Sequence, residues 1–326
     1  MRRTTCCAFI VLGGMSAAPC ASGGQEADAG IAEGTLFVPG VFEPGRQPDG
    51  NSLVFRGPTG LVVFDTGRHR EHTQRLLGAA KDAKQPIVAV INSHWHLDHV
   101  GGNAMLRGAF PELRVYASPA IEQAMQGFLV DYRAQLVRMI ERSAADQKAQ
   151  AGFIAELGLI DAGVRLYPDE RIVASKTWML AGRELQLNYE AGAVTGGDVW
   201  VFDPATRVLA AGDLVTLPVP FFDTACPAHW RAALARLEKV DFATLVPGHG
   251  APMSRESFAR YRKSFDRLLD CAAGASEKSV CAAGWIRDTG DLLPPEQQQA
   301  ARSMLDYYFD TSLRVEPAKL ASRCGA

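Results

Sequence analysis

The segment that most constrains the fold is residues 92–103, NSHWHLDHVGGN, in which three histidines and one aspartate fall within six positions. It directly follows the apolar run at residues 87–91, which predicts a buried strand. The histidines are therefore expected on a loop at the end of a strand, where α/β folds usually place their chemistry. Imidazole and carboxylate groups form a ligand set for zinc, or for iron or manganese. A metal centre explains this density better than isolated structural histidines do.

Short apolar runs bounded by Gly, Pro or Asn occur in both halves of the chain and are typical of buried strands. They predict strands at 35–41, 52–55, 61–64, 87–91, 114–117, 171–173, 177–180, 184–189, 199–202, 208–211 and 244–246. Helical spacing occurs at 72–83 and 229–239, across an insertion at about 119–163, and over most of 254–326. Strands in both halves with helices outside them predict an α/β fold whose sheets are covered by helices.

The N-terminus has the layout of a secretory signal peptide. Arg2 and Arg3 precede an apolar stretch that is too short to span a membrane and is followed by small residues. We therefore expect a periplasmic or secreted protein. Lipid anchoring at Cys20 is the less favoured alternative, because Pro19 is unlike the small residue that usually precedes such a site. The expected organisation is a signal peptide at 1–23, a linker at 24–34, a main domain at 35–253 and a helical extension at 254–326.

The cysteines are consistent with export. Of seven cysteines, three lie in the expected signal peptide, which leaves the even set Cys226, Cys271, Cys281 and Cys324. An oxidising compartment favours two disulfides among them. Cys271 and Cys281 bracket a turn between helical patterns, so we pair these two, and Cys226 with Cys324 follows by elimination. Four unrelated thiols remain the alternative.

The charge balance narrows the choice of partners. The chain has 34 basic and 36 acidic residues without a run of five like charges. Neither a nucleic-acid binder nor a polybasic membrane surface is indicated. We expect a small-molecule substrate, no nucleic acid and no membrane span, and the oligomeric state is left open.

The H-x-H-x-D-H pattern resembles the signature of the metallo-β-lactamase superfamily of metallohydrolases. Further landmarks, FDTG at 64–67, AGD at 211–213 and VPGHG at 246–250, come in the family's order. The resemblance covers about residues 35–260 and implies an αββα sandwich with its metal site at the edge between two sheets. It also implies that the residues at the matching positions are metal ligands: His94 and His96 on one metal, Asp98, His99 and His249 on a second, and Asp213 between them.

One position departs from the family pattern. The first metal's third ligand is normally a His in a segment resembling G-x-H-T-x-G-D, but residues 192–198 read GAVTGGD, with Val194 at the ligand place. An isopropyl group cannot coordinate a metal, and Glu190, four residues upstream, is a candidate replacement. Catalytic zinc usually keeps three protein ligands and an open position. We therefore expect one tightly bound Zn²⁺ at the second site and a weak or absent ion at the first, with iron as the runner-up metal.

The implied activity is hydrolysis, in which metal-activated water attacks an ester, thioester, amide or lactam. The candidate catalytic residues are Asp98, together with His94 or His96 as a general base or as a group that orients water. Two alternatives stay open: a metal- or ligand-binding protein whose chemistry was lost with the third His, and an iron-dependent oxidoreductase resembling persulfide dioxygenases. The sequence does not specify the substrate. Its apolar candidates for a pocket wall or for core packing are Met125, Phe128, Tyr132, Met139, Phe221 and Phe222.

Overall fold

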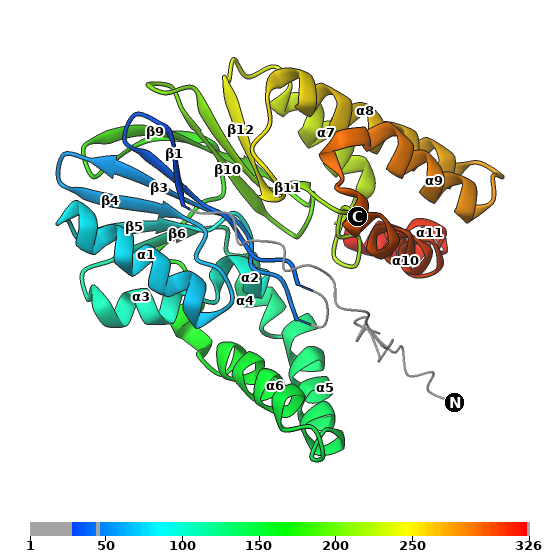
Figure 1. The fold of residues 1–326 in the computed structure, drawn as a ribbon, viewed down its shortest axis with the longest axis horizontal. Helices are drawn as coiled ribbons and strands as arrows, with labels where there is room; N and C mark the ends of the chain where they lie inside the picture. The colour runs from blue at the N-terminus through cyan, green and yellow to red at the C-terminus, as the bar shows by residue number, and fades with distance from the viewer. Residues whose placement is uncertain (1–27, 44–45, 325–326) are drawn as a thin grey trace.

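The computed structural model describes residues 28–43 and 46–324 (Figure 1). The signal peptide expected at residues 1–23 lies outside this range. Among the helices that are described, none is both long and apolar enough to cross a membrane.

The N-terminal half forms a seven-stranded sheet in sequential order. Its strands are β1 Ala29–Ala32, β2 Thr35–Val38, β3 Ser52–Gly57, β4 Gly60–Phe64, β5 Ile87–Ile91, β6 Arg114–Ala117 and β7 Glu170–Arg171. The first four strands pair antiparallel, whereas β4 through β7 pair parallel. Every residue of β4 is buried, as expected for a parallel strand that is covered on both faces.

The second sheet has five strands in the order β12-β11-β10-β9-β8. They are β8 Lys176–Leu180, β9 Arg183–Glu190, β10 Asp198–Asp203, β11 Val208–Thr216 and β12 Thr244–His249. Only β11 and β12 pair parallel. Their carboxyl ends therefore lie side by side at one edge of the sandwich.

The two sheets pack face to face and helices cover their outer faces, which confirms the αββα sandwich (Figure 1). Apolar side chains from both sheets, such as Phe55 and Leu187, share the core between them. Helices α1 (Arg70–Ala83) and α3 (Asn103–Ala109) cover the first sheet. Helix α7 (Pro227–Leu237) and the C-terminal helices cover the second, with Trp230 fully buried in that layer.

The insertion predicted at about 119–163 is helical. It consists of α4 (Ala120–Ala124), α5 (Phe128–Arg142), α6 (Gln147–Ile160) and a 3₁₀ turn, Gly163–Leu166. Helices α5 and α6 form a hairpin that projects from the sandwich (Figure 1). A separate apolar cluster joins its base to the loop after β5 and includes Trp95 and Leu136.

The C-terminal extension is also helical, as predicted. It contains α8 (Arg255–Ala273), α9 (Lys278–Thr289), α10 (Gln298–Tyr308) and α11 (Pro317–Arg323), with 3₁₀ turns at Gly290–Leu292 and Pro295–Gln297 and a π-helical turn at Phe309–Leu313. Both predicted disulfides are present: Cys271–Cys281 joins α8 to α9, and Cys226–Cys324 ties the last helix to the start of α7.

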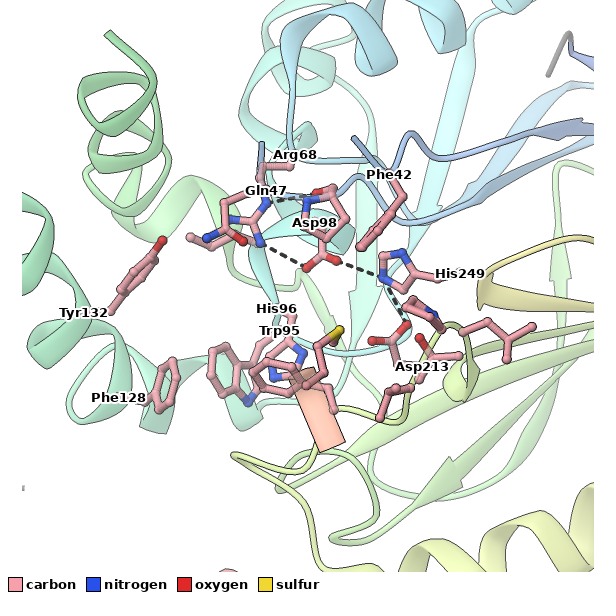
Figure 2. Close-up of a pocket in the computed structure, with 18 of the residues that line it drawn as sticks. Phe42, Gln47, Arg68, Trp95, His96, Asp98, Phe128, Tyr132, Asp213 and His249 are labelled. Atoms are coloured by element: carbon pink, nitrogen blue, oxygen red, sulfur yellow. Dashed lines mark hydrogen bonds and ion pairs between the residues drawn. The ribbon is translucent and has the colours of Figure 1, made fainter. Parts of the chain in front are cut away.

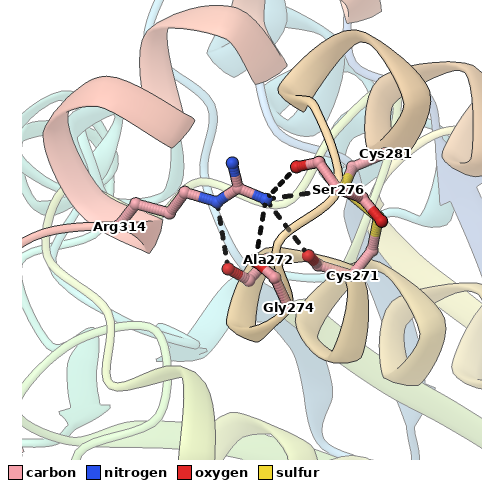
Figure 3. The surroundings of a disulfide bond; sticks show 6 residues. All are labelled: Cys271, Ala272, Gly274, Ser276, Cys281 and Arg314. Atoms are coloured by element: carbon pink, nitrogen blue, oxygen red, sulfur yellow. Dashed lines mark hydrogen bonds between the residues drawn. A yellow bond between two sulfur atoms is a disulfide. The ribbon is translucent and has the colours of Figure 1, made fainter.

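Arg314 closes the end of α8 beside the first of these disulfides (Figure 3). Its Nε donates to the carbonyl oxygen of Ala272 at 3.0 Å. Its Nη2 donates to the carbonyl oxygens of Cys271 at 3.2 Å and Ser276 at 2.6 Å. The last carbonyls of a helix have no partner within the helix, so this guanidinium satisfies groups that would otherwise lack one. The junction between α8 and α9 is thus held by a covalent bond and by one shared cation.

Three local predictions were wrong, one for the linker and two for the ends of strands. The expected linker contains β1, which turns at Gly34 (φ +60°) and pairs with β2. The strand predicted to stop at residue 211 continues to Thr216. Gly212 (φ +54°) marks an irregularity in the pairing of β11 with β12 rather than a turn, and β12 continues through Pro247 to His249. The glycine and proline that looked like turn signals therefore lie within paired strands and aim Asp213 and His249 into the sandwich edge.

Candidate metal centre

The structure brings the predicted ligands together at the edge where both sheets end. They come from the loop after β5 (His94 and His96), the short helix α2 Leu97–Val100 (Asp98 and His99), β11 (Asp213) and the last residue of β12 (His249). All are buried except His249, whose side chain is 12% exposed. This arrangement draws on elements separated by more than a hundred residues of sequence.

One group of potential ligand atoms consists of Asp98, His99 and His249, whose atoms lie within 4.8 Å of one another. The Nε2 atom of His249 is 3.0 Å from Oδ2 of Asp98 and 3.4 Å from Oδ1 of Asp213 (Figure 2). The Nε2 atom of His99 is 3.2 Å from the same oxygen of Asp213. Two carboxylates and two imidazoles thus face one small volume.

A second group, which shares His99, consists of His94, His99 and Asp213. Nε2 of His94 is 3.8 Å from Oδ2 of Asp213. Nε2 of His94, Nε2 of His99 and Oδ1 of Asp213 are all buried and lack a hydrogen-bond partner. Buried polar atoms without partners are rare because their desolvation is costly. A cation at this position would satisfy all three atoms, so the residues fit a metal.

The buried network behind the histidines fixes which ring nitrogens face the cluster. Ser93 Oγ donates its proton to Asp65 Oδ2 at 2.7 Å, so it can only accept from Nδ1 of His94 at 2.9 Å. Asp65 Oδ2 also lies 2.8 Å from Nδ1 of His99 and accepts its proton. In the neutral rings both protons therefore lie on the Nδ1 atoms, on the outside, and both Nε2 atoms turn a lone pair toward Asp213. Such outer partners set the tautomer and the orientation of metal-binding histidines.

His96 is held differently. Its Nε2 lies 3.0 Å from Oγ1 of Thr224, and this hydroxyl donates to the carbonyl oxygen of Val194 at 2.9 Å. The hydroxyl proton is thereby used, so Nε2 of His96 must be the donor and Nδ1 keeps the lone pair. Burial lowers the pKa of His96 to about 4, which keeps the ring neutral. Its ring packs against His94 with centroids 4.4 Å apart, yet it joins neither group of potential ligands among the described residues.

Val194 is buried at the place where the resemblance expects a third histidine. Its loop is fixed by Asp198, which accepts hydrogen bonds from the backbone of Ala193, Val194 and Thr195. Glu190, the candidate replacement, is engaged elsewhere: its carboxylate pairs with Arg236 of α7 and accepts from Nε1 of Trp200 at 3.1 Å. The question that the sequence left open is therefore answered against Glu190, because a helix that follows later in the chain supplies its partner.

Two charged residues that the sequence did not single out reach the cluster. Arg68 lies 3.3 Å from Oδ1 of Asp98 through Nη2 and forms an ion pair with Glu156 of α6 through Nη1. The hydroxyl of Tyr132 donates to the same Glu156 at 3.1 Å. Available sequence signals were the position of Arg68 directly after the FDTG segment and the single acid within the apolar run FIAELGLI of α6. The helical insertion is therefore connected to Asp98 by one buried guanidinium.

The charges in the cluster shift each other's pKa values. Burial alone would raise the pKa of Asp98, but His99, His249 and Arg68 hold it well below its usual range. Burial and the neighbouring His99 and His96 lower the pKa of His94 well below its usual value. The carboxylates, Asp213 foremost, outweigh burial and raise the pKa values of His99 and His249. In the absence of a cation, protons thus neutralise part of the negative charge.

A pocket opens beside the cluster, and Figure 2 shows side chains from distant elements around it. Phe128 and Tyr132 of α5 line it, as does Phe221 after β11, so these predicted candidates face the cavity. Phe222 is instead fully buried in the core. Met125 and Met139 pack with the apolar cluster at the base of the insertion.

Comparison with known proteins matches this architecture. The family model described as the metallo-beta-lactamase superfamily matches residues 45–249. Solved structures similar to the chain include a metallo-beta-lactamase from Pontibacter korlensis, with a TM-score of 0.54 and 21% identity, covering 74% of this chain and 98% of that one. A second is the structure of TMB-1, with a TM-score of 0.52 and 16% identity, covering 74% of this chain and 96% of that one. These similarities show the fold.

Curated relatives include a linear primary-alkylsulfatase from a Pseudomonas species, 24% identical over 62% of this chain and 41% of the relative. Another is the alpha subunit of a 2,4-dinitroanisole O-demethylase from a Nocardioides species, 25% identical over 70% of this chain and 61% of the relative. The chain therefore spans less than two thirds of the length of these relatives. The family match covers more than half of the chain, and on this basis the chain belongs to the metallo-beta-lactamase superfamily.

Proposed function

We propose that this chain is a zinc-dependent hydrolase whose active site is the cluster around Asp213. The observation that carries the proposal is the set of three buried ligand atoms, on His94, His99 and Asp213, that lack hydrogen-bond partners. When bound, zinc lowers the pKa of water and polarises the bond to be cleaved, which is the chemistry that hydrolysis requires. The relatives named alkylsulfatases cleave esters by their names, which supports the same class of reaction.

The ligand geometry favours unequal metal sites. Asp98, His99 and His249 supply three ligands for the tighter ion, with Asp213 as the fourth, and this meets the usual count for catalytic zinc. The first site has His94 and shares Asp213 with the tighter site. It lacks a third histidine ligand, because Val194 occupies that place. We propose that the first site therefore binds its ion weakly or not at all.

The remaining residues would act on water and substrate. His96 is neutral, and Thr224 fixes its Nε2–H, so its Nδ1 can accept a hydrogen bond from a water molecule and orient it. Arg68 holds one oxygen of Asp98 while the other oxygen faces His249. Asp98 therefore stays ionised and fixed, so we assign it a role in binding rather than in proton transfer.

The proposal is tested by removing ligands from the proposed tight site. Asp98→Ala and His249→Ala should abolish the hydrolysis of a panel of p-nitrophenyl esters, thioesters and lactams by the zinc-loaded protein. Asp241→Ala is a matched control, because Asp241 is 83% exposed and pairs only with a surface arginine. Unchanged hydrolysis in both ligand variants, with zinc still bound, would overturn the proposal.

One observation favours a second function, that of a binding protein without turnover. Val194 stands in place of the third histidine and His96 joins neither group of potential ligands among the described residues, which would leave the first metal site incomplete. Such a protein would bind zinc and small molecules but would hydrolyse none of the panel. Metal analysis of the purified protein would also detect iron, and iron in place of zinc would point to the oxidoreductase alternative.

We also propose that the protein is exported. The support is the pair of disulfides, since structural disulfides form mainly in oxidising compartments. Fractionation of the producing cell, with N-terminal sequencing of the mature protein, tests this directly. Recovery in the cytosol with an intact N-terminus would contradict it.

A further inference from the structure

The pocket beside the metal ligands is walled mainly by apolar side chains that come from five separate parts of the chain. They are Phe42 before β3, Trp95 and Leu97 after β5, Phe128 and Leu129 of α5, the segment after β11 that ends in Phe221, and Met304 of α10. The polar cluster forms one end of this pocket and aromatic side chains form the opposite wall (Figure 2). A molecule held there would place a reactive group at Asp213 and an apolar group among these walls.

The only Lys or Arg among the described lining residues is Arg68, and its nitrogens are already engaged. Nη1 pairs with Glu156, Nη2 with Asp98 at 3.3 Å, and Nε donates to the carbonyl oxygen of Pro48 at 3.1 Å. Away from the metal ligands, an anionic group would meet no available Lys or Arg among the described lining residues and would lose its hydration, which is costly. The walls therefore select against charge on the part of the substrate that they contact.

Two residues of the apolar wall lie outside the segment that the superfamily model matches, residues 45–249. Phe42 precedes this segment, and Met304 belongs to the C-terminal extension. Helix α10 is held against the site through Tyr308, whose ring lies 6.0 Å from that of Phe221. The flexible thioether of Met304 suits an apolar partner of variable shape. The extension thus contributes directly to the pocket and is not only a cover for the second sheet.

The pocket encloses about 120 Å³ and continues into a part that is open to solvent, so its apolar walls extend outward from the metal ligands. An acetyl group would leave most of these walls exposed to water, whereas a chain of several carbons or an aromatic ring would cover them.

We propose that the substrate is an ester or thioester that carries a large, uncharged, apolar group, and that Met304 and Phe128 determine this specificity. The inference rests on the proposed hydrolytic function for the bond that is cleaved. The pocket's preference for an apolar, uncharged group rests on its walls alone.

Two measurements separate the inference from the proposed function. The first is hydrolysis of p-nitrophenyl acetate, butyrate and octanoate by the zinc-loaded protein, with an adipate monoester as an analogue that carries a terminal carboxylate. The second is binding of the neutral fluorophore N-phenyl-1-naphthylamine, which needs no turnover. We expect kcat/KM to rise with chain length by up to about fourfold per buried methylene group, and the carboxylate analogue to lose this gain.

Variants at Met304 give the decisive comparison. Met304→Asp and the isosteric Met304→Gln should each weaken fluorophore binding at least severalfold and flatten the dependence on chain length. Unfolding temperatures should be measured for both, and Met304→Gln serves as the informative variant if Met304→Asp does not fold. Met179→Asp, on the edge strand β8 and 65% exposed, is the matched control and should change neither quantity.

The outcomes are distinguishable. Fluorophore binding that depends on Met304, without hydrolysis of any ester, supports the apolar pocket and overturns the hydrolytic function. Hydrolysis that is independent of chain length and unchanged by Met304→Gln overturns the inference and leaves the proposed function intact. Equal rates for the octanoate and the carboxylate analogue would likewise overturn it.

Discussion

The hydroxyl of Thr224 lies 3.0 Å from Nε2 of His96 and donates its own proton to the carbonyl oxygen of Val194 at 2.9 Å. The segment around Val194 lacks the third histidine of the family pattern, yet its backbone still fixes the ring of His96 through Thr224. A hydrogen bond from Cys226 N to Ala193 O, 2.9 Å long, holds these two segments together, and the Cys226–Cys324 disulfide ties Cys226 to the last helix. His96 is thus fixed by contacts that the signature motif does not contain.

The first prediction concerns this hydroxyl. Thr224→Val keeps the shape of the side chain but leaves Nε2 of His96 without its partner. We expect zinc affinity or hydrolysis to fall by about 10- to 100-fold, as for other outer partners of metal-site histidines, and Thr224→Ser to restore it. The imidazole ¹⁵N shifts of His96 should show a change of tautomer even without metal. Thr311→Val, which removes a hydroxyl bound only within the C-terminal helices, is the control; equal effects of both valine variants would contradict this role.

The second prediction concerns Val194. Val194→His should add a third ligand to the first site, so that a second zinc equivalent survives dialysis. The residue is only 1% exposed, so the larger ring will cost about 1–3 kcal/mol of stability through crowding. Val194→Phe imposes similar bulk without a ligand atom and should not retain the second ion. Equal metal content in both variants would argue against the assignment of this position.

The third prediction concerns the pair formed by Arg68 and Glu156, whose side chains are 10% and 7% exposed. Arg68→Met leaves the buried Glu156 carboxylate uncompensated, and we expect a loss of about 3–5 kcal/mol in the free energy of unfolding. The double variant Arg68→Met/Glu156→Met should recover part of this loss, because no buried charge is left unpaired. Denaturant unfolding of the wild type, of Arg68→Met and Glu156→Met alone, and of the double variant measures the coupling free energy. Strictly additive effects would show that the pair does not act as a unit.

The fourth prediction concerns pH. The carboxylates raise the pKa values of His99 and His249 above the usual value of 6.5, so in the metal-free protein these rings keep their protons to higher pH. Zinc needs the neutral rings, so its affinity should be highest above the raised pKa values and fall as the pH drops through them, with protons released on binding. Calorimetry in buffers of different ionisation enthalpy counts these protons. Affinity that does not change between about pH 6 and 9 would contradict the expectation.

The sequence predicted sheets covered by helices, the helical insertion and both disulfides because each leaves a local pattern: short apolar runs, helical spacing and an even cysteine set. The sandwich itself was implied by the resemblance of the motifs to the family. It missed the full length of β11 and β12, since Gly212 and Pro247 are turn formers in most contexts and only the pairing between these strands overrides that preference. It also left the role of Glu190 open, because strand position gives the face of a residue but not its partner.

The contacts that distinguish this site could not be read from the sequence for a related reason. Thr224 and His96 are separated by 128 positions, and Arg68 and Glu156 by 88. Neither Thr224 nor Glu156 lies in a motif, and their meeting with the cluster depends on how the insertion and the segment after β11 pack. A signature motif identifies ligands within one loop, whereas the tertiary fold decides what holds them.

The central claim is tested most directly by the number of zinc ions per chain after exhaustive dialysis, measured by plasma mass spectrometry on the mature protein. The account predicts one tightly held equivalent, which is lost in His249→Ala, and a second that binds only at high free zinc. Two equivalents held with equal affinity, or none at all, would contradict it.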